Sequence, residues 1–306
     1  MILSFDTSNY TTSACLFDSK NGVVWQNRIL LHPSENQRGL RQNDVVFLHI
    51  KNLETLLNDF PKNKITAVVA SERPRPVATS YMPCFLVGKN YAKALSQVLG
   101  CPFASYSHQE NHIMAALYSS GQMQLTSAPF IAMHISGGTS DILLLTPSDS
   151  GLTIEEIGGS LDLHAGQLID RVGVKLGLEF PCGKEIERVA ATANESIPIK
   201  TAVCDFQFHF SGFENKANDM IDSGVSAAII AKFVLDCVLK TLDKVIDNLN
   251  KNYNSMPILL AGGVMSNRYI ADELKKKHTN LFFSDPFYSS DHALGNAVLY
   301  SFLHKN

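Results

Sequence analysis

The sequence lacks an excess of charge of either sign, and its cysteines lack any motif spacing. The formal net charge is −3 with neutral histidines, so a broadly basic surface for nucleic acid is excluded and any such contact must be local. The six cysteines are scattered without a CxxC pair, which argues against a zinc ribbon and against a disulfide scaffold. Reduced thiols in a cytoplasmic protein are the expected state.

Long apolar runs are also missing. The longest, residues 225–239, is interrupted by Lys232 and Asp236 and is too short and too charged to span a bilayer. At the N-terminus no basic segment precedes an apolar one, and Asp6 follows early, as in a strand and unlike a signal peptide. Neither low-complexity sequence nor a long-period repeat occurs. We therefore expect a cytoplasmic protein without a membrane segment.

Strand and helix patterns alternate in the first part of the chain. Residues 1–6 and 11–18 are β-prone runs joined by a small polar turn, which predicts a hairpin. A continuous apolar run at 65–71 predicts a buried strand, and 85–100 predicts a helix with Gly100 in the stop position. This alternation is typical of an α/β protein.

A second cycle follows after a loop. Residues 129–136 and 140–146 flank a glycine turn as strands, and 257–261 predicts a strand that ends in two glycines. A helix is expected to begin directly after Gly263. With 306 residues, of which 45% are hydrophobic and 18% charged, the chain is long enough for two lobes, each with helices flanking a central sheet.

Three strand ends carry small residues at tight turns: Asp6–Ser8, Ser136–Gly138 and Gly262–Gly263. Backbone N–H groups at such turns can approach a phosphate closely, and a helix after Gly263 would add its positive end. Glycines are also what any tight turn requires. The residues alone thus leave a nucleotide cleft and plain structural turns as alternatives.

Two histidines, His108 and His112, lie just over one helical turn apart, so both rings can face one point. A metal site would need a third ligand, and ordinary surface histidines are the alternative. A zincin protease is excluded, because its HExxH motif places glutamate beside the first histidine and Gln109 stands there. The nearest acid, Glu110, lies about 200° around the helix from His108.

In their order along the chain, these pieces resemble the TsaD/Gcp family, once called glycoproteases. The resemblance extends from residue 5 to residue 297 and rests on the segments FDTS, VGKNYAKALSQVLGCPF, HQENH, SGG, LDLHAGQLIDRVGVKLGLEFPCG, FSG, GGVMSNR and SSDHALGNA. Such proteins have the two-lobed actin-like ATPase (ASKHA) fold. The resemblance implies an N-terminal lobe over 1–126 that carries the metal histidines, and a C-terminal lobe over 127–306 whose last helix packs back on the first lobe.

The resemblance also implies a metal site and a nucleotide site. His108, His112 and Asp291 would bind one divalent ion, Fe²⁺ or Zn²⁺, in a ligand set with open positions that is typical of catalytic metals. Asp291 could instead be the N-cap of a helix expected over 293–303. An adenine nucleotide, ATP or threonylcarbamoyl-adenylate, would lie against turn and helix residues of both lobes: Ser8, Ile135, Ser136, Gly137, Gly138, Thr139, Asp170, Gly183, Gly262, Gly263 and Asn267.

By this resemblance the chain would transfer a threonylcarbamoyl group from the adenylate to adenosine 37 of tRNA and release AMP. The implied partners are tRNA, a TsaB-like pseudo-enzyme subunit and a TsaE-like ATPase, with a homodimer as a further option. No catalytic side chain is assigned. The candidate tRNA contacts are basic residues on loops and at a helix end: Arg38, Arg41, Arg73, Arg75 and Lys275–Lys277.

The sequence departs from the family pattern at several positions. The usual acidic pair after the first TS is replaced by Asn9–Thr11, and the histidine after SGG is replaced by Thr139. Leu163–His164 stand where an acid and an alanine are common, and Glu214 stands where a lysine is usual. These changes predict a divergent paralogue. They keep two alternatives open: a carbamoyltransferase of the same superfamily, and a non-catalytic nucleotide-binding scaffold that partners an active relative.

Overall fold

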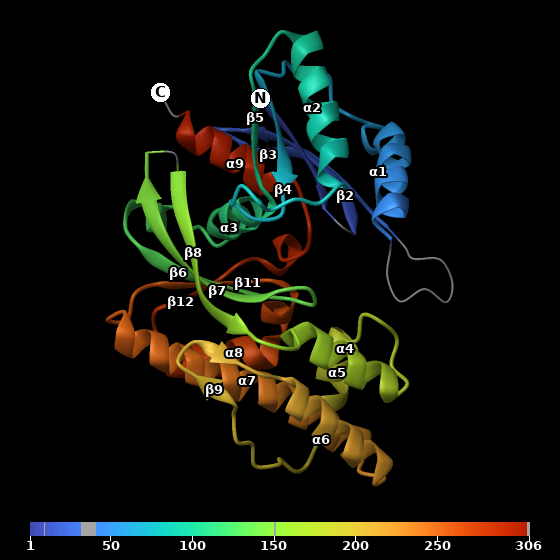
Figure 1. Cartoon of the computed structure of the whole chain (residues 1–306), viewed down its shortest axis with the longest axis vertical. Helices are drawn as coiled ribbons and strands as arrows, with labels where there is room; N and C mark the ends of the chain where they lie inside the picture. The colour runs from blue at the N-terminus through green and yellow to red at the C-terminus, as the bar shows by residue number, and fades with distance from the viewer. Residues whose placement is uncertain (9, 32–40, 150, 305–306) are drawn as a thin grey trace. The chain divides into compact units, whose positions relative to one another are not determined.

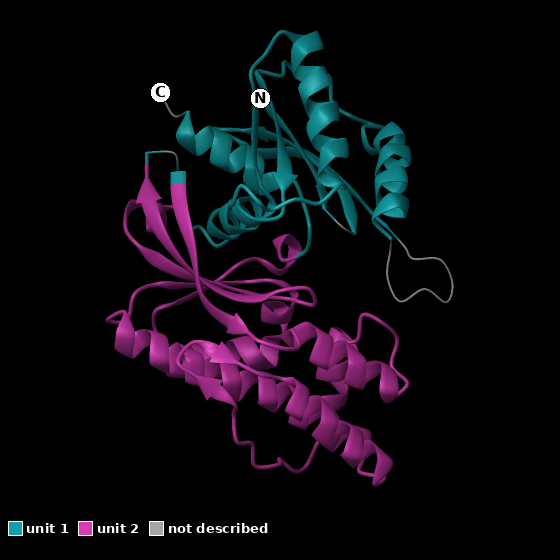
Figure 2. Ribbon diagram, in the orientation of Figure 1, with its two compact units in different colours: residues 1–121, 149–151, 290–306 teal, residues 122–148, 152–289 magenta. Residues whose placement is uncertain are grey.

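The computed structural model describes residues 1–8, 10–31, 41–149 and 151–304. Asn9, one of the departures from the family pattern, and Arg38, a candidate tRNA contact, lie outside the described residues. The chain divides into two compact units, coloured teal and magenta in Figure 2. Unit 1 consists of Met1–Gly121, Asp149–Gly151 and Ser290–Asn306, and unit 2 consists of Gln122–Ser148 and Leu152–Ser289. The lobes expected from the sequence, with a boundary after residue 126, stay a prediction.

Unit 1 is built on a mixed sheet with the strand order β3-β2-β1-β4-β5 (Figure 1). Its elements are β1 (Ile2–Ser8), β2 (Thr11–Asp18), β3 (Gly22–Leu30), α1 (Gln42–Leu56), β4 (Ala67–Arg73), α2 (Phe85–Leu99), β5 (Phe103–Ser107), α3 (His108–Ser119) and α9 (Leu294–Leu303). β1 pairs antiparallel with β2 and parallel with β4, which confirms the predicted hairpin and buried strand. The helix predicted over 85–100 is confirmed as α2, and Gly100 caps it with a left-handed φ of 63°.

The side chains of β1 alternate between the two faces of this sheet. Leu3 and Phe5 point into an apolar core shared with α1 and α2. Ser4 and Asp6 point to the opposite face, where Ser4 Oγ donates to the backbone just ahead of α9 and Asp6 reaches His108 on α3. The polar half of β1 is buried and is directed at the histidine helix and the C-terminal helix.

Helices α3 and α9 approach each other so closely that one position has no room for a side chain. A Cβ atom on Gly295 would lie 1.7 Å from the carbonyl oxygen of Asn111. The Asn111 amide also joins the two helices, because its Nδ2 donates to the carbonyl oxygen of His292 and its Oδ1 accepts from Asn296 N at 2.9 Å. Asn296 Nδ2 in turn donates to Ser71 Oγ at 2.9 Å. These bonds fix the start of α9, and the segment before it, against α3.

Unit 2 is built on a second mixed sheet with the strand order β12-β11-β6-β7-β8-β10-β9. Its elements are η1 (Met123–Ser127), β6 (Phe130–Ile135), β7 (Ser140–Ser148), β8 (Gly151–Ser160), α4 (Ala165–Lys175), α5 (Gly183–Ala190), β9 (Val203–Cys204), β10 (Gln207–Phe208), α6 (Ser211–Asp222), α7 (Ala227–Asn252), β11 (Ile258–Ala261), η2 (Gly263–Ser266), α8 (Arg268–Lys277), β12 (Leu281–Phe283) and η3 (Pro286–Tyr288). β6 and β7 form the predicted antiparallel pair, and β11 lies parallel to β6. Apolar side chains of β6 and β11 pack with those of α4–α8. Figure 1 shows these five helices together on one side of the sheet.

One predicted helix boundary is wrong. The helix expected directly after Gly263 begins only at Arg268, as α8, and the 3₁₀ helix η2 lies between them. Asn267 is the N-cap of α8, because its Oδ1 accepts a hydrogen bond of 3.0 Å from the N–H of Ile270. The positive end of this helix is therefore capped by its own chain and does not lie at the glycine pair.

Across residues 1–8, 10–31, 41–149 and 151–304, no helix combines the length and the apolar character that crossing a lipid bilayer requires. The cysteines of this part of the chain are unpaired thiols. Burial raises the pKa of Cys15 and of Cys84 to about 12, so both stay protonated at neutral pH.

Replacing Gly295 by alanine is expected to destabilise the protein, because the added Cβ collides with backbone atoms of Asn111. Overpacking of this kind costs about 1–3 kcal/mol of the free energy of unfolding, which urea titration measures. The control is Gly212→Ala in α6, where a Cβ meets open space. There alanine is expected to stabilise the helix by up to about 1 kcal/mol. A Gly295→Ala variant that is as stable as the wild type would contradict the close contact.

Candidate metal centre

The helix that carries the two histidines starts with a capping box. Ser107 is the N-cap of α3, and its Oγ accepts a hydrogen bond of 3.2 Å from the Glu110 N–H. The Glu110 carboxylate accepts a hydrogen bond of 2.7 Å from the Ser107 N–H. Glu110 is therefore committed to the backbone at the helix start. His108 is the first residue of α3 and His112 lies one turn later, so both rings face the same side.

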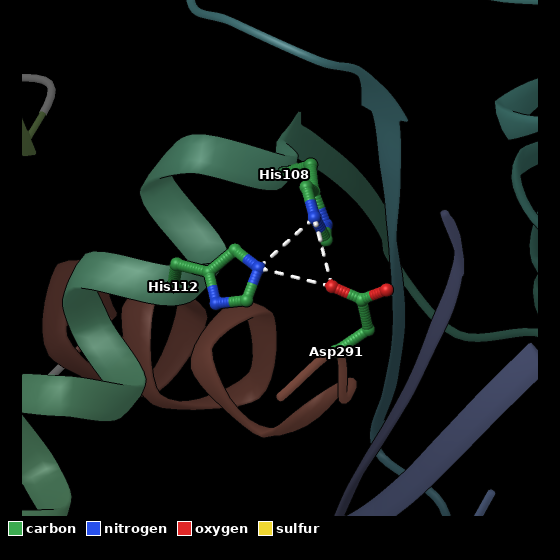
Figure 3. A group of neighbouring side chains, drawn as sticks. All are labelled: His108, His112 and Asp291. Carbon is green, nitrogen blue, oxygen red and sulfur yellow. Dashed lines mark hydrogen bonds and ion pairs between the residues drawn. The ribbon is translucent and has the colours of Figure 1, made fainter. Parts of the chain in front are cut away.

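Figure 3 shows the two imidazoles converging with the carboxylate of Asp291, which precedes α9. The Nε2 atoms of His108 and His112 are 3.0 Å apart. Oδ1 of Asp291 lies 3.5 Å from Nε2 of His108 and 3.3 Å from Nε2 of His112. All three residues belong to unit 1. The structure thus adds Asp291, which the sequence relates to the two histidines only through the family resemblance, to the pair that helical spacing predicts.

The three donor atoms have the spacing of a metal-ligand set. Ligands at about 2.0–2.2 Å from one ion, in a tetrahedral or octahedral arrangement, lie about 3–3.5 Å from one another. The observed separations of 3.0, 3.3 and 3.5 Å fall in this range. Two imidazole nitrogens and one carboxylate oxygen, with positions open for further ligands, suit Zn²⁺ or Fe²⁺. The residues present therefore fit a divalent metal ion.

A second carboxylate lies behind His108. Oδ1 of Asp6 is 3.0 Å from His108 Nδ1, and Asp6 is 0% exposed. Burial acts to raise the pKa of Asp6, but the positive charge of His108 outweighs it and holds the pKa below its ordinary value. Burial acts likewise to lower the pKa of His108, but the charges of Asp6 and Asp291 raise it to about 10. An ionised Asp6 can only accept, so Nδ1 of His108 carries the hydrogen and Nε2 is the atom presented to a metal.

Asp291 does not cap a helix. α9 starts at Leu294 with Ala293 in the N-cap position and no side-chain cap, so the N-cap alternative for Asp291 is wrong. Burial acts to raise the pKa of Asp291, but its hydrogen bonds with the two imidazoles lower it well below the ordinary value. Its other oxygen, Oδ2, accepts a hydrogen bond of 3.4 Å from Thr11 Oγ1. One departure from the family pattern, Thr11, therefore lies directly against a candidate metal ligand.

A second group of potential metal ligands lies in unit 2, with Asp243 and Asp247 on α7 and His278 after α8. Here the chain supplies its own cation. The ammonium group of Lys277 lies 2.7 Å from Asp243 Oδ2 and 3.0 Å from Asp247 Oδ2. Nε2 of His278 lies 2.7 Å from Asp243 Oδ1. This group is an internal ion-pair network, and the group at His108 is the better candidate metal centre.

The nucleotide residues predicted in unit 2 surround the turn between β6 and β7. The N–H of Ser136 donates to the carbonyl oxygen of Thr139 at 2.7 Å, and Ser136 Oγ accepts from the N–H groups of Gly138 and Thr139. The start of α4 packs on this turn so tightly that a Cβ on Gly166 would lie 2.6 Å from the backbone of Gly137. A side chain at Gly166 would therefore displace the turn.

Asp170 on α4 links this turn to α5. Its Oδ2 is 4.0 Å from the position that a Cβ on Gly137 would take. Its Oδ1 accepts a hydrogen bond of 2.8 Å from the Cys182 N–H, directly before Gly183 starts α5. Burial raises the pKa of Asp170, and the hydrogen bond from Cys182 acts in the opposite direction. The sequence predicts Asp170 and Gly183 as two separate nucleotide contacts. In the structure Cys182 links them, because its N–H bonds to Asp170 and it directly precedes Gly183.

The other glycine pair approaches the same strand end. Gly262 has a φ of 100°, and a Cβ there would lie 2.4 Å from the carbonyl oxygen of Ile135, which ends β6. Gly263 opens η2, and Asn267 is occupied as the N-cap of α8. Ser8 ends β1 and belongs to unit 1. The structure therefore gathers the predicted residues of unit 2 around the ends of β6 and β11, whereas Ser8 lies on the polar face of β1.

Several of the basic residues predicted as tRNA contacts are engaged within the chain. Arg73 pairs with Glu72, and the ammonium group of Lys276 lies 2.6 Å from Glu273. Lys277 belongs to the network of unit 2 described above. Such pairs explain these positive charges without a nucleic acid.

A family profile described as TsaD, tRNA N6-adenosine threonylcarbamoyltransferase, matches residues 51–297. This chain belongs to the TsaD family. The matched range contains both histidines and the aspartate of the candidate metal centre, together with the predicted nucleotide residues of unit 2. The family predicted from the sequence is confirmed.

Relatives that bear the TsaD name cover different shares of this chain. The tRNA N6-adenosine threonylcarbamoyltransferase of Thermus thermophilus is 32% identical over 67% of the chain, and the match spans 62% of the Thermus protein. The protein of the same name from Metamycoplasma arthritidis is 26% identical, and the match covers 96% of this chain and 95% of the relative. The chain thus matches less than two thirds of the first relative and nearly all of the second.

This TsaD-family chain shares its fold with a solved structure of a different protein. Component A of the (R)-2-hydroxyglutaryl-CoA dehydratase from Acidaminococcus fermentans matches 99% of this chain and 99% of its own, with a TM-score of 0.57 at 13% identity. A likeness at this level of identity concerns the fold alone. The fold is of the actin-like ATPase (ASKHA) type, so the predicted α/β fold class is confirmed.

A further buried histidine, His49 on α1, lies within reach of the charges of the metal centre. Its Nδ1 and Thr12 Oγ1 form a hydrogen bond of 2.8 Å. Burial lowers the pKa of His49 to about 4, in spite of the charges of Asp6 and Asp291, which act in the opposite direction. The folded chain therefore holds His49 in its neutral form at neutral pH.

His49 is expected to make the stability of the fold fall in mild acid. Below about pH 6.5 the unfolded chain binds a proton at this residue, whereas the folded chain binds it only near pH 4, so stability is lost as the pH falls through this window. The full loss is about 3 kcal/mol, and His49→Gln removes it. Urea unfolding at about pH 7.5 and about pH 4.5 measures the difference, with His304→Gln at an exposed position as control. Identical pH dependence in the wild type and in His49→Gln would contradict a neutral buried imidazole.

Proposed function

We propose that this chain transfers a threonylcarbamoyl group from threonylcarbamoyl-adenylate to the N6 amine of adenosine 37 in tRNA, assisted by a divalent metal ion. Membership of the TsaD family and the names of its relatives support this reaction class. The observation that carries the proposal is the convergence of His108, His112 and Asp291 with the spacing of a metal-ligand set. Such a site with open positions suits catalysis better than a purely structural role.

The transfer exchanges one acyl bond for another. The N6 amine forms a bond to the carbamoyl carbon, and the bond from that carbon to the phosphate oxygen breaks. AMP leaves with the electron pair of that bond, and the amine releases a proton to solvent. The family's acidic pair at the first turn is replaced here, so no side chain is assigned to take this proton.

In the proposed site, Asp6 is a positioning residue. It accepts the Nδ1 hydrogen of His108 and so directs Nε2 toward His112 and Asp291. His108, His112 and Asp291 would hold Fe²⁺ or Zn²⁺. A bound ion of this kind acts as a Lewis acid on a carbonyl or phosphoryl oxygen. Asp6 closes the buried side of the site behind His108, because its side chain is fully buried.

We assign the adenine nucleotide to residues that turn the chain tightly in unit 2. A Cβ on Gly138 would meet nothing within 4 Å, which leaves room for a ligand beside this turn. The N-terminus of α5 at Gly183 has no side-chain cap within the part of the chain that the structure describes, so its N–H groups are suited to a phosphate. The proposed nucleotide contacts in unit 2 are Ile135, Ser136, Gly137, Gly138, Thr139, Asp170, Gly183, Gly262, Gly263 and Asn267, and the role of Ser8 stays a prediction from the sequence.

The proposal extends to partners and place of action. A TsaB-like pseudo-enzyme of the same fold and a TsaE-like ATPase are the proposed protein partners, and the cytoplasm, where tRNA is modified, is the proposed location. A homodimer is the alternative assembly. The protein partners are those that the resemblance to the TsaD family implies, and the location follows from the proposed reaction on tRNA.

Two departures from the family pattern, Thr11 and Glu214, have local explanations that are compatible with activity. Thr11 donates to Asp291, so the position retains a polar contact with the metal centre although its charge is lost. Glu214 lies 3.3 Å from Arg171 on α4, so its reversed charge is compensated within unit 2. Neither change disturbs the three candidate metal ligands.

The first test is metal analysis of the purified protein. About one divalent ion per chain is expected, and His112→Ala is expected to lose it because two ligands remain. Asp6→Asn is expected to weaken binding by about 10–100-fold, as removal of an outer hydrogen bond to a ligating histidine does. The matched control, His278→Ala, removes a histidine from the group that Lys277 already neutralises and is expected to keep the ion. Loss of the ion from His278→Ala with retention in His112→Ala would move the metal site to unit 2.

The second test is the reaction itself. Purified chain, with its partner subunits, is incubated with threonylcarbamoyl-adenylate and tRNA, and modified adenosine is measured by mass spectrometry of nucleosides. Asp291→Asn is expected to lower the rate by about 100-fold or more, because a Lewis acid supplies several kcal/mol of transition-state stabilisation. Carbamoyl-phosphate turnover without tRNA would instead favour a small-molecule carbamoyltransferase. A metal-loaded chain that gives no modified adenosine would favour a scaffold.

A further inference from the structure

Unit 2 contains a cavity of about 430 Å³ that none of the predicted metal or nucleotide residues lines. One wall is the irregular segment 198–202, and the other is the segment 209–216, which leads from β10 into α6. Phe233 on α7, which is 1% exposed, closes the cavity on the side of the apolar core. The cavity therefore lies entirely within one compact unit.

The charged side chains that line the cavity are basic. Lys200, His209 and Lys216 contribute to its walls, and no carboxylate is among the described residues that line it. Neither Lys200 nor Lys216 forms an ion pair with an acidic side chain in the described part of the chain, whereas Lys276 and Lys277 do. The cavity thus has two ammonium groups that internal pairing leaves available to an anion.

An acid beside the cavity wall, Asp162, is engaged by backbone groups and by His209. Its carboxylate accepts from the N–H groups of Phe210 at 2.8 Å and Ser211 at 3.1 Å, at the start of α6. Burial acts to raise the pKa of Asp162, but these hydrogen bonds lower it to about 2. Oδ2 of Asp162 also lies 3.4 Å from His209 Nδ1. Asp162 therefore stabilises the helix start and pairs with the histidine, and the lysines are left with their full charge.

Aromatic rings form the apolar part of the cavity. Phe213 is half-buried, with its ring centroid 6.3 Å from that of Phe233 in an edge-on arrangement. The ammonium group of Lys216 lies 5.2 Å from the centre of the Phe233 ring. Pro198 adds a further apolar surface on the opposite wall. Cations beside a half-buried aromatic ring are the combination that binds a phosphate together with a base.

We propose that this cavity binds one nucleotide of the tRNA acceptor other than the reacting adenosine, with its phosphate at Lys200 and Lys216 and its base against Phe213. The inference rests on the proposed function, and it names where in unit 2 the polynucleotide is held. Both lysines are exposed at the rim, so a chain can enter and leave past them. The apolar floor offers no hydrogen-bonding pattern to a base edge, so the contact is independent of base identity.

The proposal is tested by tRNA affinity at several salt concentrations. Lys200→Gln and Lys216→Gln are expected to weaken tRNA binding, about tenfold in the double variant. The slope of log affinity against log salt is expected to become shallower by about 0.7–0.9 for each phosphate that the variant no longer neutralises. Phe213→Leu is expected to weaken binding about fivefold or more, with little change in that slope. The control is Lys244→Gln, an exposed lysine on α7 that does not line the cavity, and it should bind tRNA like the wild type.

AMP binding and the modification assay separate the possible outcomes. Unchanged tRNA affinity and slope in the double lysine variant would overturn the proposal, even where the wild type modifies tRNA. Loss of AMP affinity in that variant would also overturn it, because the cavity would then serve a free mononucleotide. If the chain binds tRNA in a lysine-dependent way and forms no modified adenosine, the proposed reaction fails and this binding site stands. Thermal melting of each variant checks that the fold is intact.

Discussion

The close backbone contact between α3 and α9 holds the candidate metal centre of unit 1 together. Asp291 lies near the end of the chain, and it meets His108 and His112 only because α9 lies directly on α3. Gly295 permits that approach by having no side chain. Asn111, placed between the two histidines in the sequence, bonds to backbone groups on the α9 side. The residue that joins the helices and the residues that face the metal are thus parts of one short segment.

The charge of the site follows from the alternation along β1. Leu3 and Phe5 bury one face of the strand in the core, and this forces Asp6 onto the face of the histidines. A wholly buried carboxylate is stable only with a positive partner and satisfied hydrogen bonds. His108 supplies both. A centre with two carboxylates and two imidazoles therefore favours a bound cation, which is the electrostatic condition for a divalent metal ion.

The sequence predicts what depends on local pattern, and it fails where the determinant is distant. The hairpin of β1 and β2, the Gly100 cap and the shared face of the two histidines follow from short-range periodicity. The helix after Gly263 starts later than expected, because Asn267 offers a cap that competes with the glycine turn. The meeting of Asp170 with Cys182 and the cavity between 198–202 and 209–216 depend on tertiary packing, and no spacing in the sequence indicates them.

The loss of an acid at Thr11 can be understood from the charge of the neighbouring Asp291. An acid at Thr11 would stand beside Asp291 and would add a further negative charge to a site that already has two carboxylates. The threonine keeps a hydrogen bond to Asp291 without that repulsion, so the three candidate metal ligands stay together without the missing acid. A proton acceptor at this turn is a different requirement, and a hydroxyl of ordinary acidity meets it poorly. Within the proposed function, holding a metal ion and removing the proton are therefore separate requirements, and the loss of the acid at this turn concerns only the second.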